Sequence, residues 1–197
     1  MRTSSPLRVY TAANQEWALD FAHDVLAAGR TIRVLSVVDA FTRECLAMEV
    51  DTSFASRRMT RVLDQIIAQR GAPLSIRCDN GPELTCRHFL AWAIDNQIEL
   101  VHIQPGKPTQ NAYVESFHGR MREECLRVSW FENLFDARRK IMAWRHDYNH
   151  QRPHSSLNYR TPAEFAQLTS YGKDTGAARF ENALGVSNFP IASTAAG

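Results

Sequence analysis

The sequence predicts an α/β fold in which one mixed sheet of five strands is flanked by helices. Three observations indicate this fold. The first part of the chain holds three strand-like stretches separated by short turns, a pattern typical of a β-meander. Helical and strand patterns then alternate, which is typical of strands joined by helical crossovers. A hydrophobic content of 44% and a charged content of 22% are those of a globular protein with a buried core.

Three strands are predicted at the start of the fold. Residues 17–21 alternate large apolar side chains with small or acidic ones, and this period of two predicts the first strand. Residues 30–39 are rich in β-branched side chains and predict the second strand, and residues 44–50 predict the third. Gly29 and residues 40–43 lie at the expected turns.

The next elements alternate between helix and strand. A helix is predicted over residues 56–70, where apolar side chains fall on one stripe and Gly71 follows as the C-terminal cap. A strand over residues 74–78, a helix over 84–96 and a strand over 98–103 follow. With the meander, these two strands make five.

Helices are predicted for the rest of the periodic sequence. One runs over residues 111–126, capped by Asn111, and another over residues 135–150. The Thr-Pro-Ala-Glu sequence at residues 161–164 is a capping box with proline at the first helical position, so a short helix begins there.

The distribution of periodic patterns predicts one domain. Gly, Ala, Ser and Asn occur without periodicity beyond Leu168. We therefore expect an irregular lead-in over residues 1–13, a folded core over 14–168 and a loosely ordered tail over 169–197.

Composition excludes several classes of protein. The four cysteines form no CxxC pair and no regular framework, so neither a zinc site nor a disulfide scaffold is indicated. No apolar run approaches the ~18 residues of a membrane span, and no signal peptide begins the chain. These features predict a cytoplasmic protein. The net charge is +2, but residues 116–152 hold eight Lys or Arg against five Asp or Glu. This local excess indicates a phosphate-bearing partner or a solvated helix face.

Two aspartates lie where a cation would bind. Asp20 is inside an apolar predicted strand, and a half-buried carboxylate needs a partner or a cation. An exposed position on an edge strand is the alternative. Asp79 ends the fourth predicted strand, where ligands gather in sheets with helical crossovers. Asp-Asn-Gly is also ordinary turn chemistry.

A third carboxylate, Glu115, lies on the helix predicted over residues 111–126. At ~100° per residue, His118, Gly119 and Arg122 share its side of the helix, beside the apolar stripe. Glycine is costly inside a helix, and it would allow close approach of a bulky partner. A surface helix with an incidental glycine is the alternative.

Two-metal phosphoryl transfer is the chemistry that would unite the three carboxylates. Two Mg²⁺ ions roughly 4 Å apart stabilise the attacking and leaving oxygens of an in-line displacement, and Mg²⁺ prefers hard oxygen ligands. Three carboxylates without a cation would repel one another. The residues alone do not establish that the three meet in space.

Eight motifs, taken together in order and spacing, carry a specific resemblance. They are Trp-Ala-Leu-Asp-Phe at 17–21, Val-Asp-Ala-Phe-Thr-Arg at 38–43, Arg-Cys-Asp-Asn-Gly-Pro-Glu at 77–83, Pro-Gly-Lys-Pro at 105–108, Gln-Asn-Ala-Tyr-Val-Glu-Ser-Phe at 110–117, Arg-Glu-Glu-Cys-Leu at 122–126, Asp-Tyr-Asn at 147–149 and Arg-Pro-His-Ser-Ser-Leu at 152–157. From about Glu16 to Phe165 the chain resembles the integrase-like catalytic subunit of bacterial insertion-sequence transposases of the OrfB type, relatives of retroviral integrases. The 35 residues between Asp79 and Glu115 match the spacing in that family.

The resemblance implies a ribonuclease H-like fold with Asp20 and Asp79 on adjacent strands and Glu115 on a helix beside them. It implies that these three residues, the Asp-Asp-Glu (DDE) set, are catalytic and bind Mg²⁺, with Mn²⁺ as a substitute and two ions expected. The implied reaction cuts DNA to leave a 3′-hydroxyl, which then attacks a second phosphodiester. No covalent enzyme–DNA intermediate is expected.

The implied partners are the DNA of transposon ends and target, in a dimer or higher multimer. Because only 19 residues precede Asp20, a companion helix-turn-helix polypeptide is also expected, with the active protein associated with the bacterial nucleoid. Lys107, His118 and Arg122 are candidate DNA contacts from charge and placement. A ribonuclease H-type nuclease, and a decayed transposase that only binds DNA, are the alternatives.

Overall fold

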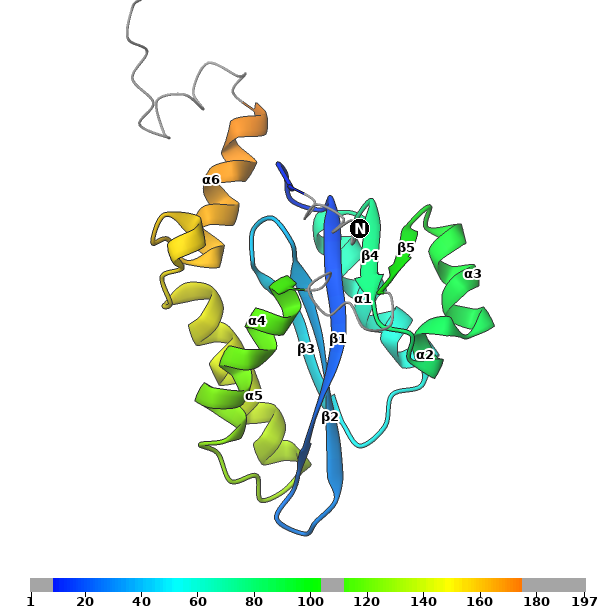
Figure 1. Cartoon of the computed structure of the whole chain (residues 1–197), viewed down its shortest axis with the longest axis vertical. Helices are drawn as coiled ribbons and strands as arrows, with labels where there is room; N and C mark the ends of the chain where they lie inside the picture. The colour runs from blue at the N-terminus through cyan, green and yellow to red at the C-terminus, as the bar shows by residue number, and fades with distance from the viewer. Residues whose placement is uncertain (1–8, 104–111, 175–197) are drawn as a thin grey trace, which may run out of the picture.

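The computed structural model describes residues 9–103 and 112–174. Within these residues, five strands form one sheet in the order β3-β2-β1-β4-β5 (Figure 1). The strands are β1 (Glu16–Val25), β2 (Thr31–Asp39), β3 (Cys45–Asp51), β4 (Ser75–Cys78) and β5 (Glu99–His102). The first three pair antiparallel, whereas β4 runs parallel to β1 and β5 runs parallel to β4. The predicted mixed five-stranded sheet is confirmed.

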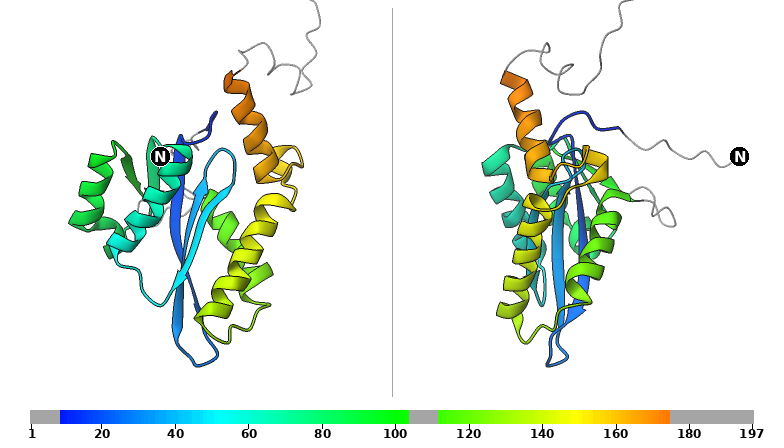
Figure 2. Two further views of the ribbon diagram at one scale, coloured as in Figure 1. Left: turned by 180° about the vertical axis from the view of Figure 1, so that it is seen from behind. Right: turned by 90° about the vertical axis from the view of Figure 1, so that its left-hand side faces the viewer.

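Helices cover both sides of this sheet. They are α1 (Ser56–Arg70), α2 (Pro82–Thr85), α3 (Arg87–Asp95), α4 (Ala112–Met121), α5 (Leu134–His150) and α6 (Pro162–Asp174). Figure 1 shows α1, α2 and α3 on one side of the strands and α4 and α5 on the other. The right-hand view of Figure 2 looks onto the side that carries α4 and α5. No helix in the described part of the chain is both long and apolar enough to cross a bilayer.

Two hydrophobic cores follow from the alternation of side chains along β1. Ala18 and Ala22 face α4 and α5, in a core that also holds Phe117 of α4. Trp17 and Leu19 face the opposite way, into the core beneath α1 and α3. Because strand side chains alternate between faces, Asp20 projects from the side of β1 that α4 covers.

Aromatic packing fixes the position of α4. The ring of Phe117 meets those of Tyr148 and Trp144 of α5 at centroid distances of 4.9 Å and 5.4 Å, both edge-on. Such pairs add about 0.5–1.5 kcal/mol to the free energy gained by burial. The predicted apolar stripe on this helix is confirmed, since Val114, Phe117 and Met121 are all buried.

Two predicted helices differ from those observed. The helix predicted over residues 84–96 is two helices, because Pro82 starts α2 early and Cys86 is extended before α3. The helix predicted over 111–126 is α-helical only to Met121, and a π-helical turn follows over Arg122–Leu126. That turn buries the adjacent residues Cys125 and Leu126 together. The cap expected at Asn111 lies outside the described residues.

The last helix, α6, begins where the sequence predicts and ends later than predicted. The capping box is confirmed: the Thr161 amide donates to Glu164 Oε2 at 2.9 Å, and the Glu164 amide donates to Thr161 Oγ1 at 3.2 Å. However, α6 continues to Asp174, past the predicted core boundary at 168. Thr169 and Ser170 take part in the helix, each donating its hydroxyl to the carbonyl of Ala166.

His154 is a buried histidine in an electropositive setting. It is 4% exposed, its Nδ1 lies 3.2 Å from Arg120 Nη1 and its ring packs edge-on against that of Tyr148. Burial, together with the charges of Arg120, Arg152 and Arg43, lowers the pKa of His154 from 6.5 to about 4. Its neutral form is therefore favoured in the folded protein.

The free energy of unfolding should decrease as the pH falls from about 6.5 to about 4. Over that range the unfolded chain protonates His154 while the folded chain does not, so protons favour unfolding. Urea unfolding of the wild type and of His154→Leu at several pH values measures this. The difference in stability between the two proteins should change with pH in this window. An identical pH dependence in both would contradict the assignment.

Candidate catalytic site

Asp20 lies in the middle of the central strand. It pairs with Ser36 of β2, and its side chain is 26% exposed. The two carboxylate oxygens have different partners: Oδ1 accepts the Phe21 amide at 2.7 Å, and Oδ2 lies 3.3 Å from Nδ1 of His118 on α4. The predicted partner of this strand carboxylate is therefore a histidine on the covering helix.

Asp79 directly follows β4, beside Asp20. In the parallel pairing of β1 with β4, Ala18 is opposite Arg77. The same register continued by two residues brings Asp79 level with Asp20. The chain after Asp79 is held to the end of β5, because the Asn80 side-chain amide donates to the Ile103 carbonyl at 2.9 Å.

Gly81 allows the Asp79 carboxylate to fold back onto the chain. Asp79 Oδ1 accepts the Gly81 amide at 2.9 Å, and a Cβ added to Gly81 would lie 3.1 Å from that same oxygen. Any larger residue would press on the carboxylate. The φ of Gly81 is −56°, so glycine here serves close approach rather than a special backbone angle.

The pKa of the Cys78 thiol is affected by the charges of both aspartates. Burial raises its pKa to about 12, and the negative charges of Asp79 and Asp20 contribute in the same direction. Both carboxylates therefore lie within electrostatic range of one buried group. The thiol itself is therefore protonated at neutral pH.

Glu115 is exposed on α4, one helical turn before His118. Since His118 contacts Asp20, that contact brings the Glu115 part of α4 to the side of β1 from which Asp20 projects. No contact described joins Glu115 directly to either aspartate. Among residues 9–103 and 112–174, no three acidic, histidine or cysteine side chains are grouped closely enough to hold a metal ion.

The chemistry of these donors suits a hard divalent cation. All three candidates offer carboxylate oxygens, the ligands that Mg²⁺ prefers. Asp20 and Asp79 each accept a backbone amide with Oδ1, and this holds one oxygen of each carboxylate in place. One carboxylate thus stands on β1, and the other directly follows the neighbouring strand β4.

The residues predicted to contact DNA have different surroundings. His118 is only 3% exposed and its Nδ1 lies 3.3 Å from Asp20 Oδ2, so its contact with DNA stays a prediction. Arg122 is exposed at the start of the π-helical turn, as a phosphate contact would require. Lys107 lies outside the described residues.

Sequence reasoning missed a buried ion pair between the two strands that carry the aspartates. Arg77 of β4 donates from Nε to Glu16 Oε1 at 2.7 Å and from Nη2 to Oε2 at 3.0 Å. Glu16 is 2% exposed. The sequence offered one indication of this pair, because Glu16 and Arg77 each lie within a few residues of a candidate aspartate.

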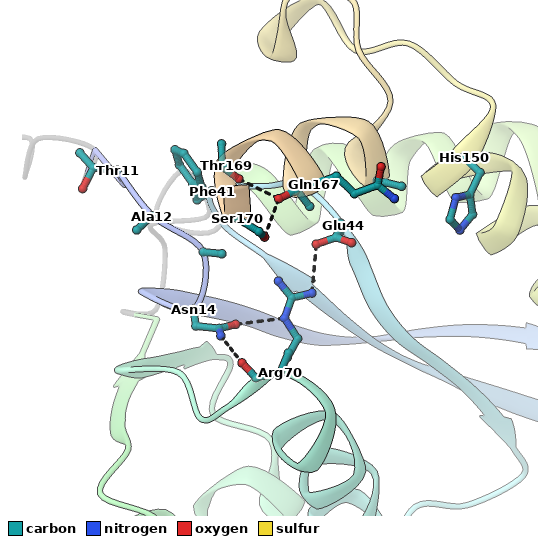
Figure 3. Close-up of a pocket in the computed structure, with 13 residues that line it drawn as sticks. Thr11, Ala12, Asn14, Phe41, Glu44, Arg70, His150, Gln167, Thr169 and Ser170 are labelled. Carbon is teal, nitrogen blue, oxygen red and sulfur yellow. Dashed lines mark hydrogen bonds and ion pairs between the residues drawn. The ribbon is translucent and has the colours of Figure 1, made fainter. Parts of the chain in front are cut away.

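A pocket of about 630 Å³ lies away from these carboxylates, between the segment before β1, the end of α1 and α6 (Figure 3). None of the three carboxylates lines it. Arg70 in its wall is already engaged by Glu44 at 3.0 Å and by Asn14 at 3.1 Å. These bonds join α1 to the start of the sheet, so the arginine has a structural role.

Known proteins resemble this chain in sequence. Residues 10–108 match a family model described as an integrase core domain, and residues 96–162 match a second model of the same description. An uncharacterized 31.7 kDa protein of insertion element IS407 from Burkholderia multivorans is 50% identical over 155 residues, covering 79% of this chain and 56% of that protein. A 39.2 kDa protein of insertion element IS476 from Xanthomonas euvesicatoria is 49% identical over 153 residues, covering 78% and 44%. The chain thus spans about half the length of these curated relatives.

Solved structures resemble it in fold. The catalytic core domain of HTLV-2 integrase in complex with magnesium superposes with a TM-score of 0.63 at 18% identity, covering 79% of this chain and 97% of that one. A chain of the simian T-cell lymphotropic virus intasome superposes with a TM-score of 0.70 at 17% identity, covering 98% and 63%. At these identities the likeness concerns the fold alone.

Proposed function

The chain belongs to the integrase core domain family and has the ribonuclease H-like fold, and from this premise we propose that it is the catalytic domain of a DNA transposase of the DDE type. One observation carries the proposal. The parallel register of β1 and β4 pairs Ala18 with Arg77, and continued by two residues it would bring Asp79 level with Asp20, which contacts His118 on the helix that bears Glu115. The insertion-element relatives support DNA as the substrate.

In the proposed reaction, water attacks a DNA phosphodiester and the bond from phosphorus to the 3′-oxygen breaks, which leaves a 3′-hydroxyl. This hydroxyl then attacks a second phosphodiester. The new bond joins the 3′-oxygen to phosphorus as the bond to the leaving oxygen breaks. Asp20, Asp79 and Glu115 would hold two Mg²⁺ ions, or Mn²⁺ in their place, which when bound neutralise charge on the phosphate and on both oxygens.

The chain itself supplies position and charge. The backbone amides of Phe21 and Gly81 fix the two aspartates. The exposed guanidinium of Arg122 contacts a DNA phosphate, and so does Lys107, giving affinity without base reading. Such positioning is the main task of a protein in phosphoryl transfer.

The proposed assembly is a dimer or higher multimer on transposon-end and target DNA, at the bacterial nucleoid. The solved relatives support a multimer, since they are described as an intasome and as trimeric and dimeric forms. A companion helix-turn-helix polypeptide would recognise the transposon ends.

Titration of Mn²⁺ by calorimetry, with a short DNA duplex present, tests the shared metal site. We expect Asp79→Asn and Glu115→Gln each to weaken Mn²⁺ binding at least about tenfold. Loss of a metal ligand should reduce metal affinity at least as much as loss of a residue that only orients a ligand. Glu123→Gln is the matched control. This residue lies on the same helical segment and pairs with Arg127 at the surface, so its removal should leave binding unchanged. Equal affinity in all four proteins would rule out a shared site.

A further inference from the structure

His118 is a buried side chain that contacts Asp20, one of the three candidate carboxylates. It is 3% exposed, and Nδ1 lies 3.3 Å from Asp20 Oδ2. Its Nε2 is also buried, and it has no hydrogen-bond partner among the described residues. Among the described residues, the imidazole of His118 thus makes its polar contact through Nδ1, with Asp20.

We propose that His118 is a positioning residue that fixes the orientation of the Asp20 carboxylate; the inference rests on the proposed function, in which Asp20 is a metal ligand. In this arrangement Nδ1 would carry a hydrogen and direct it toward Oδ2, because a carboxylate only accepts hydrogen bonds. The Phe21 amide holds Oδ1. With one donor on each oxygen, the plane of the carboxylate is fixed.

Packing alone does not account for a histidine at this position. A buried nitrogen without a partner destabilises the folded state, whereas an aliphatic side chain would fill the space without that cost. The imidazole is also presented by a rigid element, because the neighbouring Phe117 packs α4 against α5. A group held on a rigid element orients its partner more accurately than one on a loop.

The placement of His118 links two of the three carboxylates. His118 and Glu115 are three residues apart and share one side of α4. The helix that carries Glu115 therefore also orients Asp20 on β1. Groups that orient a metal ligand typically change metal affinity roughly 10- to 100-fold when they are lost.

Two substitutions of His118 separate positioning from packing. His118→Asn keeps an N–H donor on the atom attached to Cγ, where the histidine has Nδ1. His118→Leu fills the volume without a donor. In the Mn²⁺ titration with a short duplex, we expect His118→Leu to weaken binding roughly 10- to 100-fold and His118→Asn to stay within about threefold of the wild type. Both variants should unfold at about the wild-type temperature.

His154→Leu is the matched control. His154 is also a buried histidine with an unpartnered Nε2, but its Nδ1 faces Arg120 instead of a carboxylate. This variant should bind Mn²⁺ like the wild type. In the background of Asp20→Asn, adding His118→Leu should cause no further loss, because His118 acts through Asp20.

In the titrations, three results would overturn the inference: wild-type affinity in His118→Leu, an equal loss in His118→Asn, or additive losses in the double variant. Crystal structures of the wild type and His118→Leu test it without metal. We expect one Asp20 rotamer in the first and a different or divided one in the second, and an unchanged rotamer would refute the inference. A wild type that binds no Mn²⁺ would instead count against the proposed function.

Discussion

Replacing Asp20 by Asn is expected to lower the rate of DNA joining at least about 10³-fold while the fold remains intact. The amide has no charge to hold a cation, and the electrostatic stabilisation that a bound cation gives the transition state is worth several kcal/mol. The fold should tolerate the change. Asn still offers an oxygen to the Phe21 amide, and the side chain is partly exposed at 26%.

The measurement joins a short duplex with a free 3′-hydroxyl to plasmid DNA in Mg²⁺ or Mn²⁺ and quantifies the product on a denaturing gel. Asp24→Asn is the matched control, because Asp24 lies on the same strand and accepts the following amide at 2.7 Å, as Asp20 does. Asp24→Asn should join DNA at the wild-type rate. Comparable rates in Asp20→Asn and Asp24→Asn would remove Asp20 from the mechanism. Cutting without any joining by the wild type would favour a simple nuclease.

Replacing Arg77 by Ala is expected to lower the free energy of unfolding by about 3–5 kcal/mol. Glu16 is 2% exposed and bonded through both oxygens to this guanidinium. The substitution removes this counter-charge from a carboxylate inside the protein. The hydroxyls of Tyr10 and Ser75 also donate to Glu16 and offset part of that cost.

Urea unfolding measures this loss, with two comparisons. The double variant Glu16→Met with Arg77→Met should recover most of the stability, since apolar side chains of similar volume often replace a buried ion pair without loss. Arg61→Ala should change stability little, because Arg61 is exposed and its recorded bond is to its own helix, at Arg57. A small effect of Arg77→Ala, close to that of Arg61→Ala, would show that the pair contributes little.

Local signals in the sequence predict most of the elements. The alternation around Asp20 predicts the first strand, Gly71 ends α1 where predicted with φ of +84°, and the Thr161 capping box starts α6. These features depend on neighbouring residues alone. The break at Cys86 and the π-helical turn at Arg122 were not predicted, because they depend on which side chains the sheet buries.

The site is predictable only in part for the same reason. Its three carboxylates come from the resemblance, since no local pattern brings Asp20 to Asp79. The register that brings Asp79 level with Asp20 follows from the parallel pairing of two strands far apart in the chain. The burial of His118 depends on β1 packing against α4, and a helical projection shows only that His118 lies beside the apolar stripe.

The parallel pairing of β1 with β4 also bears on how the protein folds. Glu16 and Ser75, opposite each other in this pairing, are 59 positions apart in the chain, whereas β1 and β2 are joined by a short hairpin. Closing so long a loop costs entropy before any contact compensates for it. The hairpin can therefore form early with Asp20 already in place, and Asp79 joins it only when the two halves of the sheet meet. Under the proposed mechanism, partly folded chains would have one aspartate without the other, so DNA cutting would require the completed sheet.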